Sequence, residues 1–323
     1  MNSYPLISIC VPVYSVEDYI ERCARSLFEQ TYAEIDYVFV DDGSPDRSIE
    51  ILSQVLLDYS EREKAVKIIK HDHNYGVAVA RNTAIRHAVG DYILWVDADD
   101  SIDPHLVEKL YMKQNETNAD IVCYDIKIIF NNHIGFFING DYHDGRELVK
   151  KMLLREAPHQ LCGHLIKKSL IVDNDVKCEE NINQSEDYQM MIQIAYFANN
   201  VATLHEALYY YDRSREDSYS NNTTDESLCQ VSKTADIIES FFLNHNEKDL
   251  VEKMWQGSVI SLCRTKMLYC DLGNKVIYMK ICEMIDNTLP KLKQPLAFKY
   301  LLLSKVKSYS IFKLLISFKK FKR

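Results

Sequence analysis

Long apolar runs are absent from this sequence. No segment reaches the roughly 18 consecutive apolar residues that a membrane-spanning helix needs, although 47% of the residues are hydrophobic. The first residues also lack a basic stretch followed by an apolar one, so we expect no secretory leader. With 26% charged residues, the composition predicts a soluble globular protein.

Patterned cysteines are missing as well. The nine cysteines include no C-x-x-C pair and show no regular spacing. Because the set is odd in number and scattered, we expect neither a disulfide framework nor a structural zinc site. We therefore expect reduced thiols in a cytoplasmic protein.

Glycine-rich phosphate loops are also lacking. Neither G-x-G-x-x-G nor G-x-x-x-x-G-K-[ST] follows any predicted strand, so the usual dinucleotide and P-loop sites are excluded. The two strongest acidic clusters instead lie where predicted strands end.

Acidic side chains are absent from the last part of the chain. Residues 287–323 contain ten Lys or Arg and no Asp or Glu, whereas residues 1–286 contain 28 basic and 47 acidic side chains, a net charge of −19. Because nucleic-acid binding needs clustered basic residues, we expect no nucleic-acid partner for the acidic body. The basic end predicts contact with an anionic surface.

Strand-like and helix-like segments alternate through the first part of the chain. The pattern predicts an α/β fold, with a mostly parallel sheet and helices on both faces. Ser15, with Asp18 three residues on, predicts the start of the first helix. Further predictions are a hairpin at 126–130 and 135–138, strands at 201–204 and 208–211, and helices from about residue 225. We place a domain boundary near residue 220, which gives a catalytic domain over 1–220 and a helical region over 221–323. The predicted strands of the alternating part are 6–14, 36–40, 66–69, 92–96 and 121–124.

Three carboxylates follow the apolar strand Tyr92–Val96 directly. Asp97, Asp99 and Asp100 fall at the carboxyl end of that strand, the edge where open α/β sheets bind ligands. Three such groups repel one another unless a cation lies among them, and oxygen ligands suit Mg²⁺ or Mn²⁺ shared with phosphate. The alternative is a solvated acidic loop in which Asp103 caps the next helix.

Three further polar clusters have both structural and functional interpretations. Asp41-Asp42-Gly43-Ser44 is either a turn or a ligand-binding strand end. Arg81-Asn82 is either a surface pair or a diphosphate-binding pair. Glu186-Asp187 either places favourable charge at a helix start or supplies a general base.

The combination of these motifs resembles family 2 glycosyltransferases with the GT-A fold. The resemblance covers residues 5–215 and preserves the family's order and spacing. The matching segments are Ile7 to Tyr14, Val40 to Ser44, Asn74-x-Gly76 with Ala80-Arg81-Asn82, Asp91-Tyr92 with Val96 to Asp100, and Ser185-Glu186-Asp187. It departs at Ser15, at Ala84 and over Cys162 to Leu165, where the family usually has other residues.

The resemblance implies an inverting glycosyltransferase. Its donor would be a nucleotide-diphosphate sugar, expected to be a UDP-sugar, and its acceptor a hydroxyl of a glycan or lipid-linked oligosaccharide. Asp99, with Asp97, would bind Mg²⁺ or Mn²⁺, and Asp187, beside Glu186, would be the base. The nucleotide-sugar residues implied are Pro12, Val13, Tyr14, Asp41, Asp42, Arg81, Asn82, Asp97 and Ala98.

Two other functions fit parts of the pattern. A non-catalytic sugar-nucleotide-binding or assembly protein would share the fold, but loss of Asp99 or Asp187 would be its signature, and both are present. An aspartate-nucleophile phosphatase would use Asp97 and Asp99, but Ser101 stands where that family has Thr or Val.

The basic end of the chain alternates apolar and lysine residues. Residues 295–323 interleave Leu, Ile and Phe with lysines, which suits a helix lying on an anionic membrane surface. We expect peripheral docking on the inner face of the cell membrane. The alternative is that the apolar stripe packs on the domain over residues 1–220 and the lysines face water.

Overall fold

The computed structural model describes residues 4–214 and 224–313. The chain divides into two compact units. The first comprises Met1–Val149 and Ala157–Thr234, and the second comprises Lys150–Glu156 and Ala235–Arg323. The boundary predicted near residue 220 lies outside the described residues, so a division at that point stays a prediction.

The first unit contains the predicted alternation of strands and helices. Its first half is regular, and from β6 onward helices and strands follow less regular connections. The elements are β1 (Ile7–Val13), α1 (Ile20–Phe28), β2 (Ile35–Asp41), α2 (Ser48–Leu57), β3 (Val66–Lys70), α3 (Val77–His87), β4 (Tyr92–Trp95), β5 (Ser101–Ile102), α4 (Leu106–Thr117), β6 (Ile121–Ile129), β7 (Ile134–Phe137), α5 (Gly145–Leu153, shared with the second unit), β8 (His164–Lys167), α6 (Ser169–Val172), α7 (Glu186–Tyr196) and β9 (Val201–Asp212).

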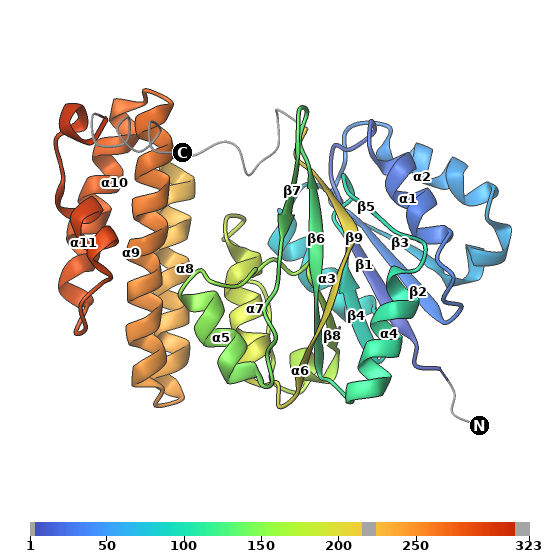
Figure 1. Cartoon of the computed structure of the whole chain (residues 1–323). Helices are drawn as coiled ribbons and strands as arrows, with labels where there is room; N and C mark the ends of the chain where they lie inside the picture. Colours follow the sequence, from blue (N-terminus) through green and yellow to red (C-terminus); the bar gives the residue numbers. More distant parts are fainter. Residues whose placement is uncertain (1–3, 215–223, 314–323) are drawn as a thin grey trace. The chain divides into compact units, whose positions relative to one another are not determined.

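One sheet connects these strands in the order β3-β2-β1-β4-β8-β6-β9-β5, with β7 paired to β6. Strands β3, β2, β1 and β4 are parallel, as predicted, and β6 pairs in parallel with β9. Strand β8 runs antiparallel between β4 and β6 (Figure 1). The α/β class is confirmed, and the four parallel strands place their carboxyl ends at one edge.

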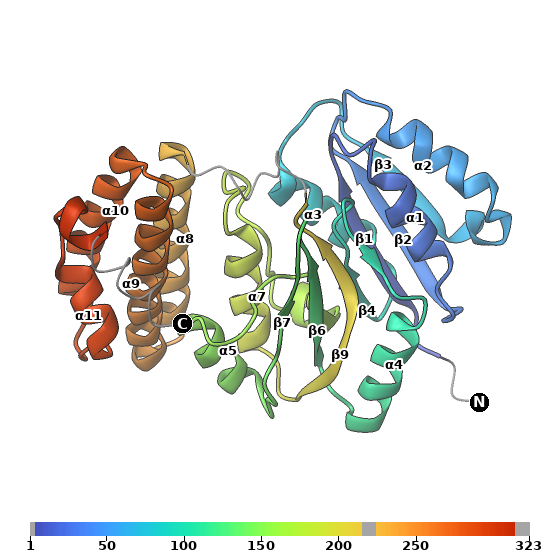
Figure 2. The same ribbon diagram turned by 45° about the horizontal axis from the view of Figure 1, so that its top comes forward.

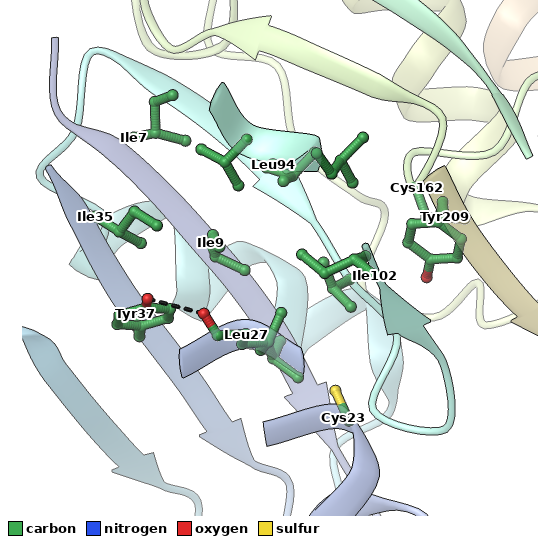
Figure 3. Close-up of a cluster of buried hydrophobic side chains, with 14 of the residues drawn as sticks. Ile7, Ile9, Cys23, Leu27, Ile35, Tyr37, Leu94, Ile102, Cys162 and Tyr209 are labelled. Atoms are coloured by element: carbon green, nitrogen blue, oxygen red, sulfur yellow. Dashed lines mark hydrogen bonds between the residues drawn. The ribbon is translucent and has the colours of Figure 1, made fainter. Parts of the chain in front are cut away.

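The main core lies on one face of this sheet. Alternate residues of β1, from Ile7 to Val13, pack with apolar residues of α1, α2 and α4, because side chains alternate between faces along a strand. Figure 3 shows Ile7 and Ile9 in this cluster, with the Tyr37 hydroxyl donating to the Leu27 carbonyl at 2.9 Å.

The opposite face is covered by α3. This helix packs on β1 and β2 (Figure 2). Its Arg81 guanidinium lies 5.8 Å from the centre of the ring of Trp95, a residue that is not part of the main core cluster. Helices therefore cover both faces, as predicted.

Three local predictions have clear outcomes. The hairpin is confirmed as β6 and β7. The strands predicted at 201–204 and 208–211 are one strand, β9. Its pairing with β6 shifts register on both sides of Asp125, so the pairing continues through the polar residues between the two predicted strands. The helix start at Ser15 is wrong. Ser15 has φ 51°, α1 begins at Ile20, and the Asp46 carboxylate accepts from the Glu17 N–H at 3.0 Å.

The second unit is helical, as predicted. It holds α8 (Asp225–Asn244) from Ala235 onward, α9 (Lys248–Asp271), α10 (Lys275–Thr288) and α11 (Phe298–Lys305). Lys266 is fully buried there, and its ammonium donates to the Leu303 carbonyl at 3.0 Å and the Val306 carbonyl at 2.6 Å.

Part of the predicted membrane-docking segment is described. Leu303 and Phe312 are buried within the second unit, whereas Leu302 is 47% exposed. The end of the segment, from residue 314, lies outside the described residues. Across residues 4–214 and 224–313, no helix combines the length and apolar character that crossing a bilayer requires.

The cysteines carry no disulfide. All nine lie in the described part of the chain as free thiols; eight are buried, and Cys229 on α8 is exposed.

Candidate active site

The carboxyl ends of three adjacent parallel strands meet at one edge of the sheet. Val13 on β1 is in register with Asp41 on β2, and Cys10 with Trp95 on β4. The segments that follow these strands line a cleft of about 620 Å³. This is the edge where open α/β sheets bind ligands.

The cleft gathers most of the residues predicted for the site. The predicted residues in its lining are Pro12, Val13, Tyr14, Asp42, Arg81, Asp97, Ala98, Asp99, Glu186 and Asp187. They come from five separate regions of the sequence, so the fold brings the motifs together.

Asp41 and Asn82 do not line the cleft. The Asp41 carboxylate is buried and accepts from the Ser44 N–H at 2.8 Å, which closes the turn after β2. The Asn82 carboxamide bonds both backbone groups of Cys178, donating to the carbonyl at 2.8 Å and accepting from the N–H at 2.9 Å. Both residues therefore have structural roles here, and their predicted ligand contacts find no support in the structure.

Asp42 holds the turn that forms one wall of the cleft. Its buried carboxylate accepts from the Tyr75 N–H at 3.0 Å and the Gly76 N–H at 2.8 Å. The His71 ring Nδ1 lies 2.7 Å from the same carboxylate. Much of its hydrogen-bonding capacity is used in positioning the turn.

Asp100 anchors the acidic loop after β4. Its carboxyl is fully buried and accepts from the Tyr209 hydroxyl at 2.6 Å and the Asp212 N–H at 2.8 Å. The Tyr209 oxygen also accepts from the Asp97 N–H at 3.1 Å. Burial raises the pKa of Asp100 well above its usual value, and Asp99 and Asp97 raise it further. Asp100 is thus a structural member of the acid cluster.

Asp97 and Asp99 are the acids of this loop that line the cleft. No group of three or more His, Cys, Asp or Glu side chains in residues 4–214 and 224–313 forms a metal site by itself. Two carboxylates are the number that Mg²⁺ commonly takes from a protein when substrate phosphates complete its shell. The donor set therefore fits a divalent cation shared with a diphosphate.

Arg81 links the two sides of the cleft. Its Nη1 donates to the Glu186 carboxylate at 2.6 Å and its Nη2 to Asp97 at 3.3 Å. Burial alone would lower the pKa of the guanidinium, but the charges of Glu186 and Asp97 outweigh it and raise the pKa. The guanidinium is 6% exposed, so its main partners are these acids of the protein.

Glu186 and Asp187 begin α7 and differ in environment. Glu186 is buried, and burial raises its carboxyl pKa to about 8; Arg81 opposes this and Asp187 adds to it. One guanidinium faces three acids here, Glu186, Asp97 and Asp187. Asp187 is half-buried in the cleft lining. When two neighbouring carboxyl groups have environments that give them different pKa values, they can take different chemical roles.

The cleft contains polar residues that the sequence interpretation did not assign to the site. They are Gln160, Asn183, Gln184 and Tyr211. Asn183 and Gln184 directly precede Ser185-Glu186-Asp187, and that proximity was an available signal. Gln160 lies in the segment before β8, and Tyr211 lies on β9. No local sequence pattern indicates that either residue reaches the cleft.

Comparisons with known proteins agree with this geometry. The sequence model of the family described as glycosyl transferase family 2 matches residues 8–164. The uncharacterized glycosyltransferase EpsJ of Bacillus subtilis (strain 168) is 32% identical over 216 residues, which are 64% of this chain and 61% of EpsJ. The chain therefore spans less than two thirds of the length of EpsJ.

Two further proteins resemble most of the chain. Glycosyltransferase GlyG of Streptococcus pneumoniae serotype 4 (strain ATCC BAA-334 / TIGR4) is 29% identical over 286 residues, which are 81% of this chain and 85% of GlyG. A crystal structure of S. aureus TarS in complex with UDP-GlcNAc shares the fold, with a TM-score of 0.72 and 18% identity, over 98% of this chain and 92% of that chain. Residues 8–164, just under half of the chain, match the family described as glycosyl transferase family 2, and the fold over nearly the whole chain is that of TarS.

Proposed function

We propose that this chain is an inverting glycosyltransferase. It moves a sugar from a nucleotide-diphosphate sugar to a hydroxyl of a glycan or lipid-linked acceptor. The observation that carries the proposal is that two acid pairs, Asp97 with Asp99 and Glu186 with Asp187, line one cleft from distant parts of the sequence.

The donor lies against the strand ends in this proposal. Pro12 to Tyr14 and the turn held by Asp42 form the wall for the nucleotide, and Asp97-Ala98-Asp99 faces the diphosphate. A bound Mg²⁺ or Mn²⁺ would neutralise the charge that develops on the diphosphate as the anomeric C–O bond breaks. Asp99 would bind the ion, and Asp97, already paired with Arg81, would face the ribose or the water around the ion.

Asp187 is the general base. It takes the proton of the acceptor hydroxyl as that oxygen attacks the anomeric carbon on the face opposite the departing diphosphate, which inverts the configuration. The base and the donor-side acids must therefore lie on different segments, as α7 and the loop after β4 do. The Arg81 guanidinium donates to the Glu186 carboxylate at 2.6 Å, so Glu186 is held by this pair instead of competing as base.

The acceptor is brought from a membrane surface in this proposal. The basic segment over residues 295–323 docks on an anionic cytoplasmic leaflet, where each basic residue contributes about 1 kcal/mol. Such a surface would supply lipid-linked acceptors to the enzyme.

A non-catalytic sugar-nucleotide binder is the second candidate. It would share the cleft and the fold, but it needs no base near the donor. Binding of a nucleotide sugar without release of the nucleotide would favour it.

Nucleotide-dependent thermal stabilisation tests the donor site. We expect UDP with Mn²⁺ to raise the melting temperature of the wild-type chain more than UDP alone, because a ligand that binds only the folded state stabilises it. TarS, which shares the fold, was crystallised with UDP-GlcNAc, so UDP is tested before GDP and dTDP. Asp99→Asn should remove the Mn²⁺ dependence, whereas Asp175→Asn, on a 92% exposed side chain, should keep it.

Nucleotide release tests the reaction. The nucleotide that stabilises the wild-type chain identifies which sugar nucleotides to supply, and release of that nucleotide with an added glycan acceptor is measured. Equal stabilisation with and without Mn²⁺ would count against the metal role. No stabilisation by any of the three diphosphates would refute the donor site.

A further inference from the structure

The loop that precedes the Glu186–Asp187 pair is held in a strained conformation. Ser185, the residue before α7, has φ +71°, a left-handed conformation that costs a non-glycine residue about 1 kcal/mol or more. Such a conformation persists only where surrounding contacts impose it. The contacts on Asn183 and Gln184 supply that constraint.

Gln230 holds this loop from a distant helix. Its side chain is 6% exposed, and its Oε1 accepts from the Asn183 N–H at 3.0 Å and from the Gln184 N–H at 2.9 Å. The other end of the carboxamide, Nε2, lies 3.5 Å from a Glu226 carboxylate oxygen one turn earlier on α8. One buried oxygen thus satisfies both N–H groups that lead into the strained residue.

Asn183 joins the same loop to the turn on the opposite wall of the cleft. Its Oδ1 accepts from the Ala78 N–H at 3.3 Å. A Cβ on Gly76, where φ is +95°, would lie 2.4 Å from the Asn183 side chain, so the close approach depends on glycine there. The Asp42 carboxylate fixes Gly76 in turn.

We propose that Gln230 is a positioning residue for transfer, acting through the backbone of Asn183 and Gln184 to place Asp187. This inference rests on the proposed function, in which Asp187 is the base. Removing the Gln230 oxygen leaves two N–H groups without their acceptor and releases the constraint on Ser185. A displacement of about 1 Å at a reacting group lowers rates by up to about 100-fold.

Donor binding should change little when Gln230 is replaced. The walls assigned to the nucleotide follow β1, β2 and β4, and Asp42 holds the Gly76 turn without Gln230. The inference therefore predicts a loss in kcat without a matching loss in nucleotide affinity.

Three α8 variants of the full chain test the proposal. Gln230→Met removes the accepting oxygen. Gln230→Glu keeps it, and is made together with Glu226→Gln so that an amide and a carboxylate still face each other. Lys233→Met introduces the same methionine at an exposed position of the helix. We expect Gln230→Met to lower kcat about 10-fold, with the Kd for UDP and Mn²⁺ within about twofold of wild type. Gln230→Glu and Lys233→Met should stay within about threefold of the wild-type kcat.

Amide hydrogen exchange supplies a readout that needs no turnover. The Asn183 and Gln184 amides should exchange faster in Gln230→Met and at the wild-type rate in Gln230→Glu. An unchanged kcat in Gln230→Met, equal losses in both Gln230 variants, or unchanged amide exchange would each overturn the inference. An inactive wild-type chain would instead refute the proposed function, whatever the exchange shows.

Discussion

Replacing Tyr209 with phenylalanine should destabilise the first unit and disturb the donor side of the cleft. The Tyr209 hydroxyl is fully buried, donates to Asp100 at 2.6 Å and accepts from the Asp97 N–H at 3.1 Å. Phenylalanine fills the same space but leaves both partners short of a hydrogen bond. The cost is therefore an unsatisfied donor and an unsatisfied acceptor, not a cavity.

The magnitude follows from these two bonds. A buried polar group left without its partner costs about 1–3 kcal/mol, so Tyr209→Phe should lower the free energy of unfolding by about 3 kcal/mol. For a domain of this size class, each kcal/mol lowers Tm by about 2–4 °C, which gives about 6–12 °C. UDP affinity in the presence of Mn²⁺ should also weaken, because the loop that carries Asp97 loses its anchor.

Tyr124 provides a matched control. Its ring is fully buried 6.4 Å from the Tyr209 ring, but within the described residues its hydroxyl has no hydrogen-bond partner. Tyr124→Phe removes an unsatisfied hydroxyl and should change stability by about 1 kcal/mol or less. Urea and thermal unfolding followed by circular dichroism measure both variants. If Tyr209→Phe is no less stable than Tyr124→Phe, the hydroxyl does not anchor the loop.

Three further predictions concern the acid pair and the basic end. Asp187→Asn should reduce sugar transfer about 100-fold or more while nucleotide binding persists, because an amide cannot take the proton; near wild-type transfer would assign the base elsewhere. The raised pKa of Glu186 implies that its contribution to stability is full below about pH 4.5 and is lost as pH rises through about 8. Melting temperatures of the wild type and Glu186→Gln are therefore compared from pH 5 to 8. The melting temperature of the wild type should fall relative to that of the variant as pH rises, and parallel profiles would contradict the raised pKa. A chain ending at Leu289 should bind anionic liposomes less than the full chain at low salt; equal binding by both would exclude docking through the basic end.

The positions of the acid clusters could be predicted because they depend on local patterns. The end of an apolar strand is visible in the sequence, because polar residues follow the apolar run. Parallel strands end at the same edge of a sheet, so the sequence predicts that Asp42, Asp97 and Asp99 lie close together, and all three line the cleft. Neighbouring residues on a strand or helix point in different directions, however. Asp41 and Asn82 consequently turn away from the cleft while their neighbours line it.

Long-range partners were beyond what the sequence could specify. Tyr209 was expected to pack within a strand, and it does, but nothing near it in the sequence shows that its hydroxyl serves Asp100. Arg81 was expected near a diphosphate, yet its guanidinium is bonded to Glu186 and Asp97. Each of these contacts joins residues whose approach depends on the whole sheet, so no local periodicity encodes it.

The distribution of thiols gives the chain a natural attachment point for a spectroscopic probe. Cys229 is exposed next to Gln230, while the other eight cysteines are buried. Cys162 lines the cleft, but burial raises its pKa well above the usual range, which suppresses the reactive thiolate. A maleimide fluorophore should therefore label the native protein at one position without mutagenesis. Its emission would report movements of α8 beside the loop that precedes Asp187 as nucleotide is added.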